Sequence, residues 1–255
     1  MDKAKIEKII EEFAETYPHS DNTGWEKPLV AYARADDPLF GQLKELASPI
    51  HEKPADFLKE AKTVITYFIP FKEQVVESNL KGRYCSKTWA LSYIETNKLI
   101  AALNQQLQEL LIKEGYRAVY VPATHNFDPK TLLSGWSHRS VAYIAGLGTF
   151  GVNHMLITKA GCCGRIGSLV TDLELEATPR PTKEYCLHLA GGSCGRCAKK
   201  CVNSALSLND LDKQKCYEIC LINVERQADL ESITDVCGKC LVGVPCSTAA
   251  PRWLS

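Results

Sequence analysis

The stretch Cys194-Gly-Arg-Cys197-Ala-Lys-Lys-Cys201, followed by Cys237-Gly-Lys-Cys240, decides how the C-terminal part of this 255-residue chain folds. A Cys-x-x-Cys pair places two sulfurs on one tight turn facing one metal centre, and a cysteine four positions further on reaches a neighbouring centre. Nine of the twelve cysteines lie beyond residue 179, one more than two four-iron clusters require. They stand at positions 186, 194, 197, 201, 216, 220, 237, 240 and 246. The spacing therefore predicts two 4Fe-4S clusters.

Three other uses of these cysteines compete with clusters. Disulfides need an oxidising compartment, and the N-terminus, Met1-Asp-Lys-Ala-Lys-Ile-Glu, has no apolar signal core that would direct the chain there. All-cysteine zinc sites also use paired Cys-x-x-Cys units, but here the two units are 40 residues apart, longer than the usual zinc spacing. Unmetallated thiols rarely gather at such turns. Structural zinc is the more serious alternative.

Length and charge fit an intracellular enzyme. At 255 residues the chain buries a sizeable core, as one large domain or as a domain with an appendage. Thirty basic residues balance thirty acidic ones, so the net charge of zero gives no electrostatic reason to expect a nucleic acid partner. No apolar run approaches the length of about 18 residues that suggests a membrane span. We expect a cytoplasmic protein with neither nucleic acid nor membrane as a partner.

Helices and strands alternate through residues 1–178. Apolar residues recur at helical spacing in two segments, and short β-branched or aromatic runs stopped by proline are typical of strands. The predicted helices span residues 3–17, 89–114 and 138–145, and the predicted strands span residues 63–69, 118–121, 155–158 and 168–171. Residues 179–255 have little apolar periodicity. We predict an α+β protein in which an α/β domain (1–178) precedes a cysteine-rich domain (179–255).

The string Gly146-Leu-Gly-Thr-Phe-Gly151 matches the dinucleotide-binding fingerprint literally. That fingerprint requires the glycines to open a helix whose N-terminus meets a pyrophosphate. The following residues, 152–161, form a short β-like run instead, with no room for a helix before the next strand. We expect Gly146 to end the preceding helix and the glycines to let backbone lie close to a large flat cofactor. A glycine-rich turn that serves only packing is the alternative.

Residues 137–158, Ser-His-Arg-Ser-Val-Ala-Tyr-Ile-Ala-Gly-Leu-Gly-Thr-Phe-Gly-Val-Asn-His-Met-Leu-Ile-Thr, then Gly-Ser-Leu-Val-Thr-Asp at 167–172 and the cysteine-rich end, resemble the epoxyqueuosine reductase family. That family is distantly related to reductive dehalogenases. The resemblance extends over about residues 60–251. It implies a nitroreductase-like domain that holds base-off cobalamin and a ferredoxin-like double 4Fe-4S domain. Electrons would pass through the clusters to cobalt.

The same resemblance assigns the cluster ligands. One cluster would take Cys186, Cys194, Cys197 and Cys246, and the other Cys201, Cys216, Cys237 and Cys240. The chain departs from the family pattern at three places: Val202 replaces the usual proline, Cys186 stands eight residues before Cys194, and a longer gap with an inserted proline precedes Cys246. Cys220, four residues after Cys216, is an alternative ligand.

The resemblance also suggests cofactor-binding and catalytic residues. Cobalamin would lie against His138, Gly146, Leu147, Gly148, Gly151 and Asn153. Asp128 is the nearest match to the family's catalytic aspartate, and His138 could donate a proton above the corrin. A polar Asp-Pro turn and a structural histidine are the alternatives for these two. For Cys85, Cys162 and Cys163, buried thiols are the expected state.

The expected partners follow from the same resemblance. An electron donor such as ferredoxin or flavodoxin would reduce the clusters, and the substrate would be a small molecule or a corrinoid. Epoxyqueuosine reductases continue into a helical-repeat domain that grips tRNA, whereas this chain stops at Ser255, so we expect no tRNA substrate. Two alternatives remain: a flavin-dependent iron–sulfur reductase, and an electron-transfer or corrinoid-binding module without a substrate of its own.

Overall fold

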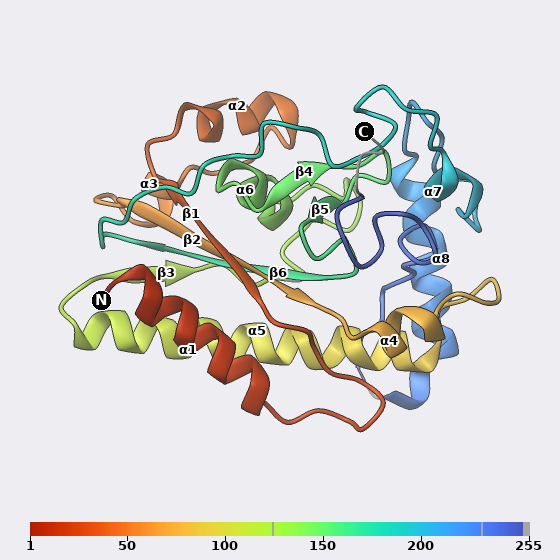
Figure 1. The fold of residues 1–255 in the computed structure, drawn as a ribbon, viewed down its shortest axis with the longest axis horizontal. Helices are drawn as coiled ribbons and strands as arrows, with labels where there is room; N and C mark the ends of the chain where they lie inside the picture. The colour runs from red at the N-terminus through yellow and green to blue at the C-terminus, as the bar shows by residue number, and fades with distance from the viewer. Residues whose placement is uncertain (124, 231, 252–255) are drawn as a thin grey trace.

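The computed structural model describes residues 1–123, 125–230 and 232–251. Its centre is a four-stranded antiparallel sheet in the order β1-β2-β6-β3 (Figure 1). The strands are β1 (Leu29–Arg34), β2 (Thr63–Pro70), β3 (Ala118–Tyr120) and β6 (Gly164–Thr171). A separate hairpin pairs β4 (Gly148–Phe150) with β5 (Leu156–Thr158). The fold is therefore mixed, with helices packed around an antiparallel sheet.

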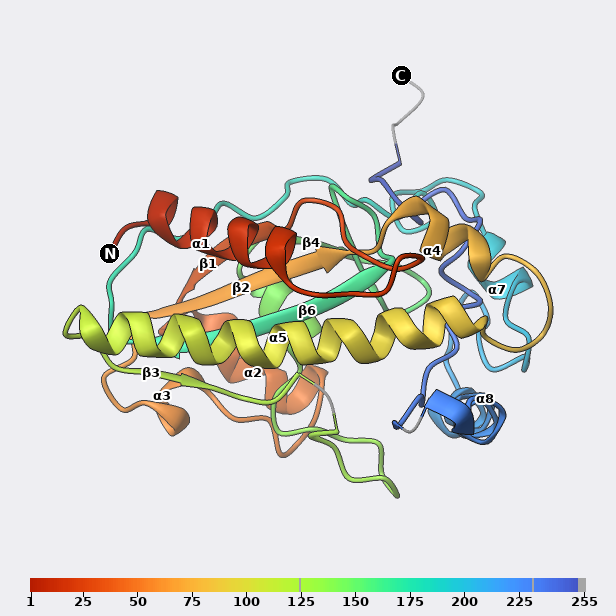
Figure 2. The same ribbon diagram turned by 90° about the horizontal axis from the view of Figure 1, so that it is seen from below.

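Helices cover both faces of the sheet (Figures 1 and 2). The helices of the first part are α1 (Lys3–Thr16), α2 (Pro38–Leu46), α3 (Pro54–Phe57), α4 (Glu73–Ser78), α5 (Lys87–Lys113) and α6 (His138–Ile144). Successive side chains of β2 point to opposite faces of the sheet, so they pack alternately against the helices on either face. Its residues Ile65 and Tyr67 join the core beneath α1 and α5, whereas Val64 and Phe68 join the core beneath α2 and α6.

Helix α5 is the longest element, and its sequence explains its bounds. Ser86 caps its N-terminus by accepting a hydrogen bond from the Trp89 amide at 3.0 Å. Leu99, Leu103 and Leu107, four residues apart, form a stripe that is fully buried against the sheet. Gly115, with φ of +86°, ends the helix because that backbone conformation favours glycine.

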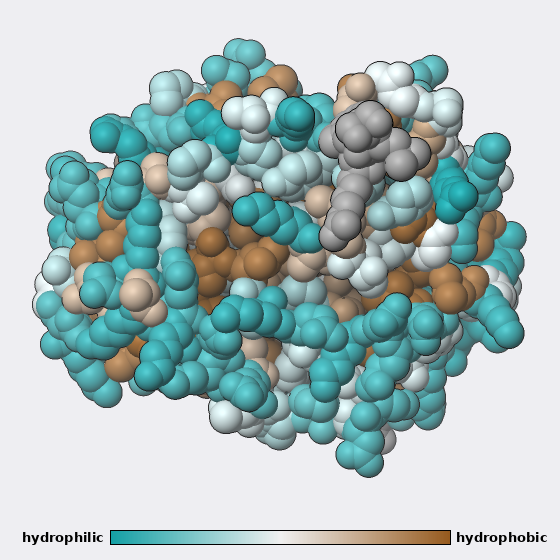
Figure 3. Space-filling view, viewed as in Figure 1, coloured by the Kyte–Doolittle hydropathy of each residue, from teal (hydrophilic) through white to brown (hydrophobic). Residues whose placement is uncertain are grey.

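The cysteine-rich part packs at one end of the sheet, where Figure 1 shows α7 (Arg196–Lys199) and α8 (Lys213–Arg226). A 3-10 turn, η1 (Ala228–Leu230), follows α8, and the rest of this part is loop. Hydrophilic side chains cover most of the surface in Figure 3, with apolar side chains gathered in smaller patches. Among the residues described, no helix has both the length and the apolar character needed to cross a membrane.

The predicted helices and strands are confirmed, with ends that shift by at most four residues. The reasoning about the glycine string is also confirmed, because α6 ends just before Gly146 and the chain then enters the β4–β5 hairpin rather than a helix. The prediction omitted β1, α2, α8 and the short elements α3, α4, α7, β4 and η1. The division into domains at residues 178 and 179 stays a prediction.

Candidate metal centre

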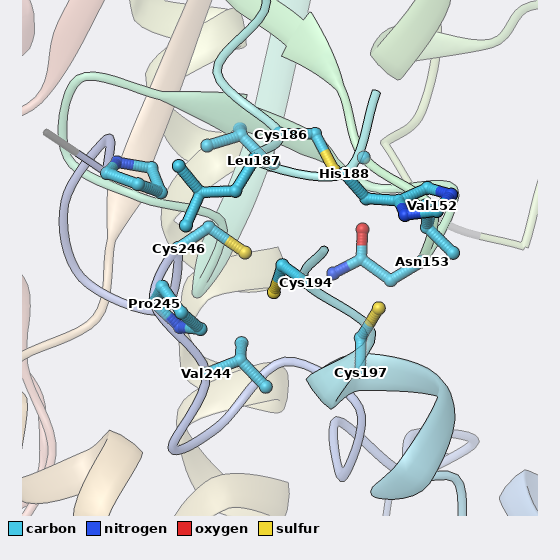
Figure 4. Close-up of a pocket in the computed structure, with 13 residues that line it drawn as sticks. Val152, Asn153, Cys186, Leu187, His188, Cys194, Cys197, Val244, Pro245 and Cys246 are labelled. Atoms are coloured by element: carbon cyan, nitrogen blue, oxygen red, sulfur yellow. The ribbon is translucent and has the colours of Figure 1, made fainter. Parts of the chain in front are cut away.

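Four cysteines from three segments of the chain line one pocket (Figure 4). They are Cys186, Cys194, Cys197 and Cys246, the set that the family resemblance implies for one cluster. The pocket encloses about 20 Å³ and is partly open to solvent. In Figure 4 the sulfur atoms of Cys194, Cys197 and Cys246 point into this space together with the Asn153 amide. We name these four residues the first cysteine group.

The turn after β5 holds the C-terminal loop that carries Cys246. The Cys162 amide donates to the Cys246 carbonyl at 3.0 Å, and the Cys163 amide donates to the Ser247 carbonyl at 3.0 Å. Gly161 has φ of +81°, and a Cβ there would stand 2.3 Å from the Ser247 carbonyl oxygen. Only glycine permits this close approach. The loop and the turn therefore fix the position of Cys246.

A second cysteine group consists of Cys201, Cys216, Cys237 and Cys240. Burial, with added repulsion from Cys237 and Cys201, raises the pKa of the Cys216 thiol to about 11. Burial also raises the pKa of Cys240 above its usual range, and its charged neighbours are the other three members together with Cys197. These mutual effects on the pKa fit the second ligand set that the family resemblance implies.

Cys220 lies at the edge of the second group. Burial raises the pKa of its thiol, and repulsion from Cys216 and Cys237 adds to the shift. Its sulfur donates to the Cys216 carbonyl at 3.5 Å, one helical turn back along α8. The structure therefore keeps Cys220 within reach of this group, as the sequence alternative required.

The loop between Cys237 and Cys240 is anchored to the first part of the chain. Asn79 donates from Nδ2 to the Cys237 carbonyl at 2.9 Å. Lys239, only 4% exposed, donates from Nζ to the carbonyls of Asn79 and Lys81 at 2.8 and 2.7 Å. Within the described part of the chain, no carboxylate pairs with Lys239. A buried cation without a carboxylate favours an anionic group beside it.

The sulfurs do not close around a single atom. Across residues 1–123, 125–230 and 232–251, no three His, Cys, Asp or Glu side chains converge closely enough to hold one metal ion. Thiol ligands must lose their protons to bind metal, so metal uptake by these high-pKa cysteines releases protons and depends on pH.

The glycine motif has a packing role. A Cβ at Gly148 would lie 2.0 Å from the Ile157 carbonyl oxygen, and one at Gly146 would lie 2.8 Å from the Pro179 carbonyl oxygen. A Cβ at Gly151 would lie 2.7 Å from the side-chain oxygen Oδ1 of Asn153. These close approaches fit the packing alternative, because each Cβ direction faces the protein itself. The expectation that the glycines also let backbone lie close to a flat cofactor stays a prediction.

Leu147 and Asn153 also differ from the expectation. Leu147 is 6% exposed and packs in the core beneath α2 and α6. Asn153 lines the pocket of the first cysteine group, where its Oδ1 accepts from the Met155 amide at 3.2 Å. Neither side chain lines a space that the structure shows to fit a corrin.

His138 is buried within α6 and the sheet, and both ring nitrogens have protein partners. Nε2 donates to the Pro122 carbonyl at 3.1 Å, which fixes the tautomer and leaves Nδ1 to accept from Ser168 Oγ at 2.9 Å. Trp136 Nε1 donates to the same Ser168 hydroxyl at 3.0 Å. Burial lowers the pKa of His138 to about 4. These contacts favour the structural alternative over a proton donor.

Asp128 organises an exposed turn. Its Oδ1 accepts from the backbone amides of Lys130 and Thr131 at 2.8 Å each, and these hydrogen bonds lower the pKa of the carboxyl group. Capping of this kind is what an Asp-Pro turn requires. The geometry favours the turn alternative over a catalytic aspartate.

A polar cluster that the sequence did not suggest lies near α8. The Asp235 carboxylate accepts from the Tyr93 hydroxyl at 2.6 Å and lies 3.2 Å from His125 Nε2. The Arg165 guanidinium stacks on the Tyr93 ring at 4.3 Å. These residues come from α5, β6 and two loops, so no local motif could have linked them.

Solved structures supply the comparisons with known proteins. The epoxyqueuosine reductase from Streptococcus thermophilus superposes with a TM-score of 0.58 at 18% identity, over 99% of this chain and 68% of that one. An epoxyqueuosine reductase from Bacillus subtilis, with its catalytic loop swung out of the active site, gives 0.60 at 16% identity over the same shares. The chain has the fold of epoxyqueuosine reductases. A reductive dehalogenase whose structure suggests a mechanism for B12-dependent dehalogenation gives 0.58 at 16% identity, over 88% of this chain and 30% of that one.

The resemblance predicted from the sequence is thus confirmed at the level of the epoxyqueuosine reductase fold. No protein-family model and no curated protein matches the chain. At identities below 20%, the shared fold does not by itself assign cofactors or substrate, which depend on the residues of this chain.

Proposed function

We propose that this protein is an iron–sulfur oxidoreductase that carries electrons through two 4Fe-4S clusters to a corrinoid. The observation that supports the proposal most directly is the first cysteine group, whose four members line one pocket although up to 60 residues separate them in the chain. Four thiolates are the usual ligand set of a four-iron cluster. The fold shared with epoxyqueuosine reductases and a reductive dehalogenase supports the same class of chemistry.

The charge beside the second cysteine group supports clusters. Beside the second group, the buried Lys239 ammonium suits the net negative charge that a thiolate-ligated cluster carries.

The order of the cysteines along the chain suggests a path for electrons. Cys197 belongs to the first group and Cys201 to the second, although only one turn of chain separates them. Repulsion from Cys197 also contributes to the raised pKa of Cys240, which supports two neighbouring groups. Electrons would therefore enter at one cluster and reach the other over a short distance. A ferredoxin or flavodoxin is the proposed electron donor.

Corrinoid binding is proposed from the shared fold. In the structure, the Cβ directions of the three glycines face the protein, Leu147 is in the core and His138 has both ring nitrogens engaged. Contacts of these residues and Asn153 with a corrin stay a proposal that depends on the family resemblance. Base-off cobalamin stays the proposed cofactor and flavin its alternative, with a small molecule or a corrinoid as substrate.

Metal and sulfide analysis tests the cluster proposal. Protein purified without oxygen should carry about eight irons and eight sulfides, the content of two four-iron clusters. Cys197→Ser and Cys240→Ser should each remove about half of both. Cys85→Ala is the matched control, because Cys85 is a buried thiol outside both groups and its loss should leave the content unchanged. About two zincs without sulfide would refute the proposal.

Ligand titration tests the cofactor. Cob(II)alamin added to the anaerobic protein should give a base-off electron paramagnetic resonance signal. Tight binding of flavin mononucleotide without any corrinoid signal would transfer the proposal to a flavin-dependent iron–sulfur reductase. Binding of cobalamin without turnover of any electron acceptor would favour a carrier module.

A further inference from the structure

The indole of Trp89 is buried near the second cysteine group, against Gly238. Trp89 is 2% exposed, yet within the part of the chain that the structure describes its Nε1 has no hydrogen-bond partner. A buried donor without a partner is unfavourable, because it loses its hydrogen bond to water and gains none in the protein. Trp25 and Trp136, by contrast, donate from Nε1 to Thr96 and Ser168 at 2.7 and 3.0 Å. The unpaired nitrogen therefore points to a missing acceptor.

The edge of the indole that carries Nε1 lies against the loop between two proposed ligands. A Cβ at Gly238 would stand 2.3 Å from the indole carbons Cε2 and Cζ2 and 2.6 Å from Nε1. Gly238 also has φ of +71°, so both its conformation and this contact require glycine. The loop Cys237-Gly-Lys-Cys240 thus leaves room for an indole N–H between its cysteines.

Hydrogen bonds fix the position of this loop relative to Trp89. Asn79 donates to the Cys237 carbonyl and accepts from the Ser86 amide, both at 2.9 Å. Ser86 in turn caps the turn of α5 that carries Trp89. Phe71 packs edge-on against the indole with ring centroids 5.2 Å apart, which limits its rotation. The position of the indole relative to the cysteines is therefore built into the fold.

From this geometry we propose that Trp89 Nε1 donates a hydrogen bond to a sulfur of the cluster held by the second cysteine group. Trp89 is then a positioning and tuning residue for electron transfer, and the inference depends on the proposed function. A donor at sulfur stabilises the reduced cluster more than the oxidised one, because the reduced form carries one more negative charge. Hydrogen bonds to sulfur are one of the determinants of cluster potential.

Potentiometric titration with dithionite, followed by electron paramagnetic resonance, tests the proposal. Trp89→Phe keeps the aromatic packing and removes the donor. We expect it to weaken one-electron reduction of one cluster about tenfold, which is a shift of about 59 mV to lower potential. Trp136→Phe is the matched control, since it removes a buried indole whose N–H is already paired, and it should leave both potentials unchanged. An unshifted potential in Trp89→Phe would overturn the inference.

A measurement without a change at position 89 covers the case in which Trp89→Phe does not fold. Tryptophan labelled with ¹⁵N is incorporated into the protein with Trp253→Phe, and pulsed electron paramagnetic resonance is recorded on the reduced clusters. A hyperfine coupling to an indole nitrogen is expected, because the other described tryptophans are paired elsewhere. Its absence would refute the hydrogen bond. Protein without clusters would instead refute the proposed function.

Discussion

Acidification should destabilise this protein through His138. Its pKa in the folded state is about 4, against 6.5 for a free histidine, because burial disfavours the imidazolium. Between these values the unfolded chain binds the proton and the folded chain does not, so stability falls as the pH falls. At pH 5 the unfolded histidine is 1.5 units below its pKa, which at about 1.36 kcal/mol per unit gives a loss of about 2 kcal/mol relative to neutral pH.

Urea unfolding at pH 7, 6 and 5 measures this loss. His138→Gln keeps a donor for the Pro122 carbonyl and cannot titrate, so its free energy of unfolding should fall by about 2 kcal/mol less than that of the parent protein between pH 7 and pH 5. The pKa of His51 is also lowered by burial, but His51 is present in both proteins and its contribution cancels in the difference. Identical pH profiles would show that His138 is not the neutral, buried group described above.

Three further predictions test other assignments. Gly148→Ala should destabilise the β4–β5 hairpin by about 1–3 kcal/mol in thermal unfolding, since its Cβ would meet the Ile157 carbonyl; unchanged stability with lost cobalamin binding would restore the cofactor role. Asp128→Asn retains an acceptor for the two turn amides and should keep reductase activity, whereas a loss of activity with an intact fold would restore the catalytic role. With zero net charge, the protein should not bind tRNA tightly at physiological salt in filter-binding assays; a sub-micromolar, salt-sensitive complex would contradict this.

Elements with strong periodicity were predictable from the sequence. Helix α5 repeats leucine on one face, and β2 is a continuous β-branched and aromatic run, so each pattern matches one structure. Helix α8 escaped prediction because only Ile219 and Asn223 on it are buried, and its inner face is made largely by cysteines. Without an apolar stripe, a helix of this kind has no hydrophobic period to detect.

Chemistry was predictable where spacing alone determines it. Cys194 and Cys197 line one pocket, as the Cys-x-x-Cys spacing predicts for two sulfurs on one turn. The assignment of the other thiols to clusters came from the family resemblance and stays a prediction. The roles of His138 and the glycines were not predictable, since they depend on contacts with Ser168, Pro122 and Ile157, 16 to 30 residues away or on a paired strand. A histidine or glycine looks the same in a sequence whether its neighbour is a cofactor or the protein itself.

The proposed clusters would link metal binding to folding in the cysteine-rich part of this chain. The loops that carry Cys237, Cys240 and Cys246 are held in place by Asn79 and by the turn before β6. Burial raises the pKa of the Cys237 and Cys240 thiols, and a hydrogen bond with Cys162 together with burial raises the pKa of Cys246. Lys239 is buried, with its ammonium held by two backbone carbonyls. Ligation of the proposed clusters would ionise the thiols and supply negative charge beside the ammonium, so both costs would fall. The proposal therefore predicts that removal of the metal destabilises the last third of the chain.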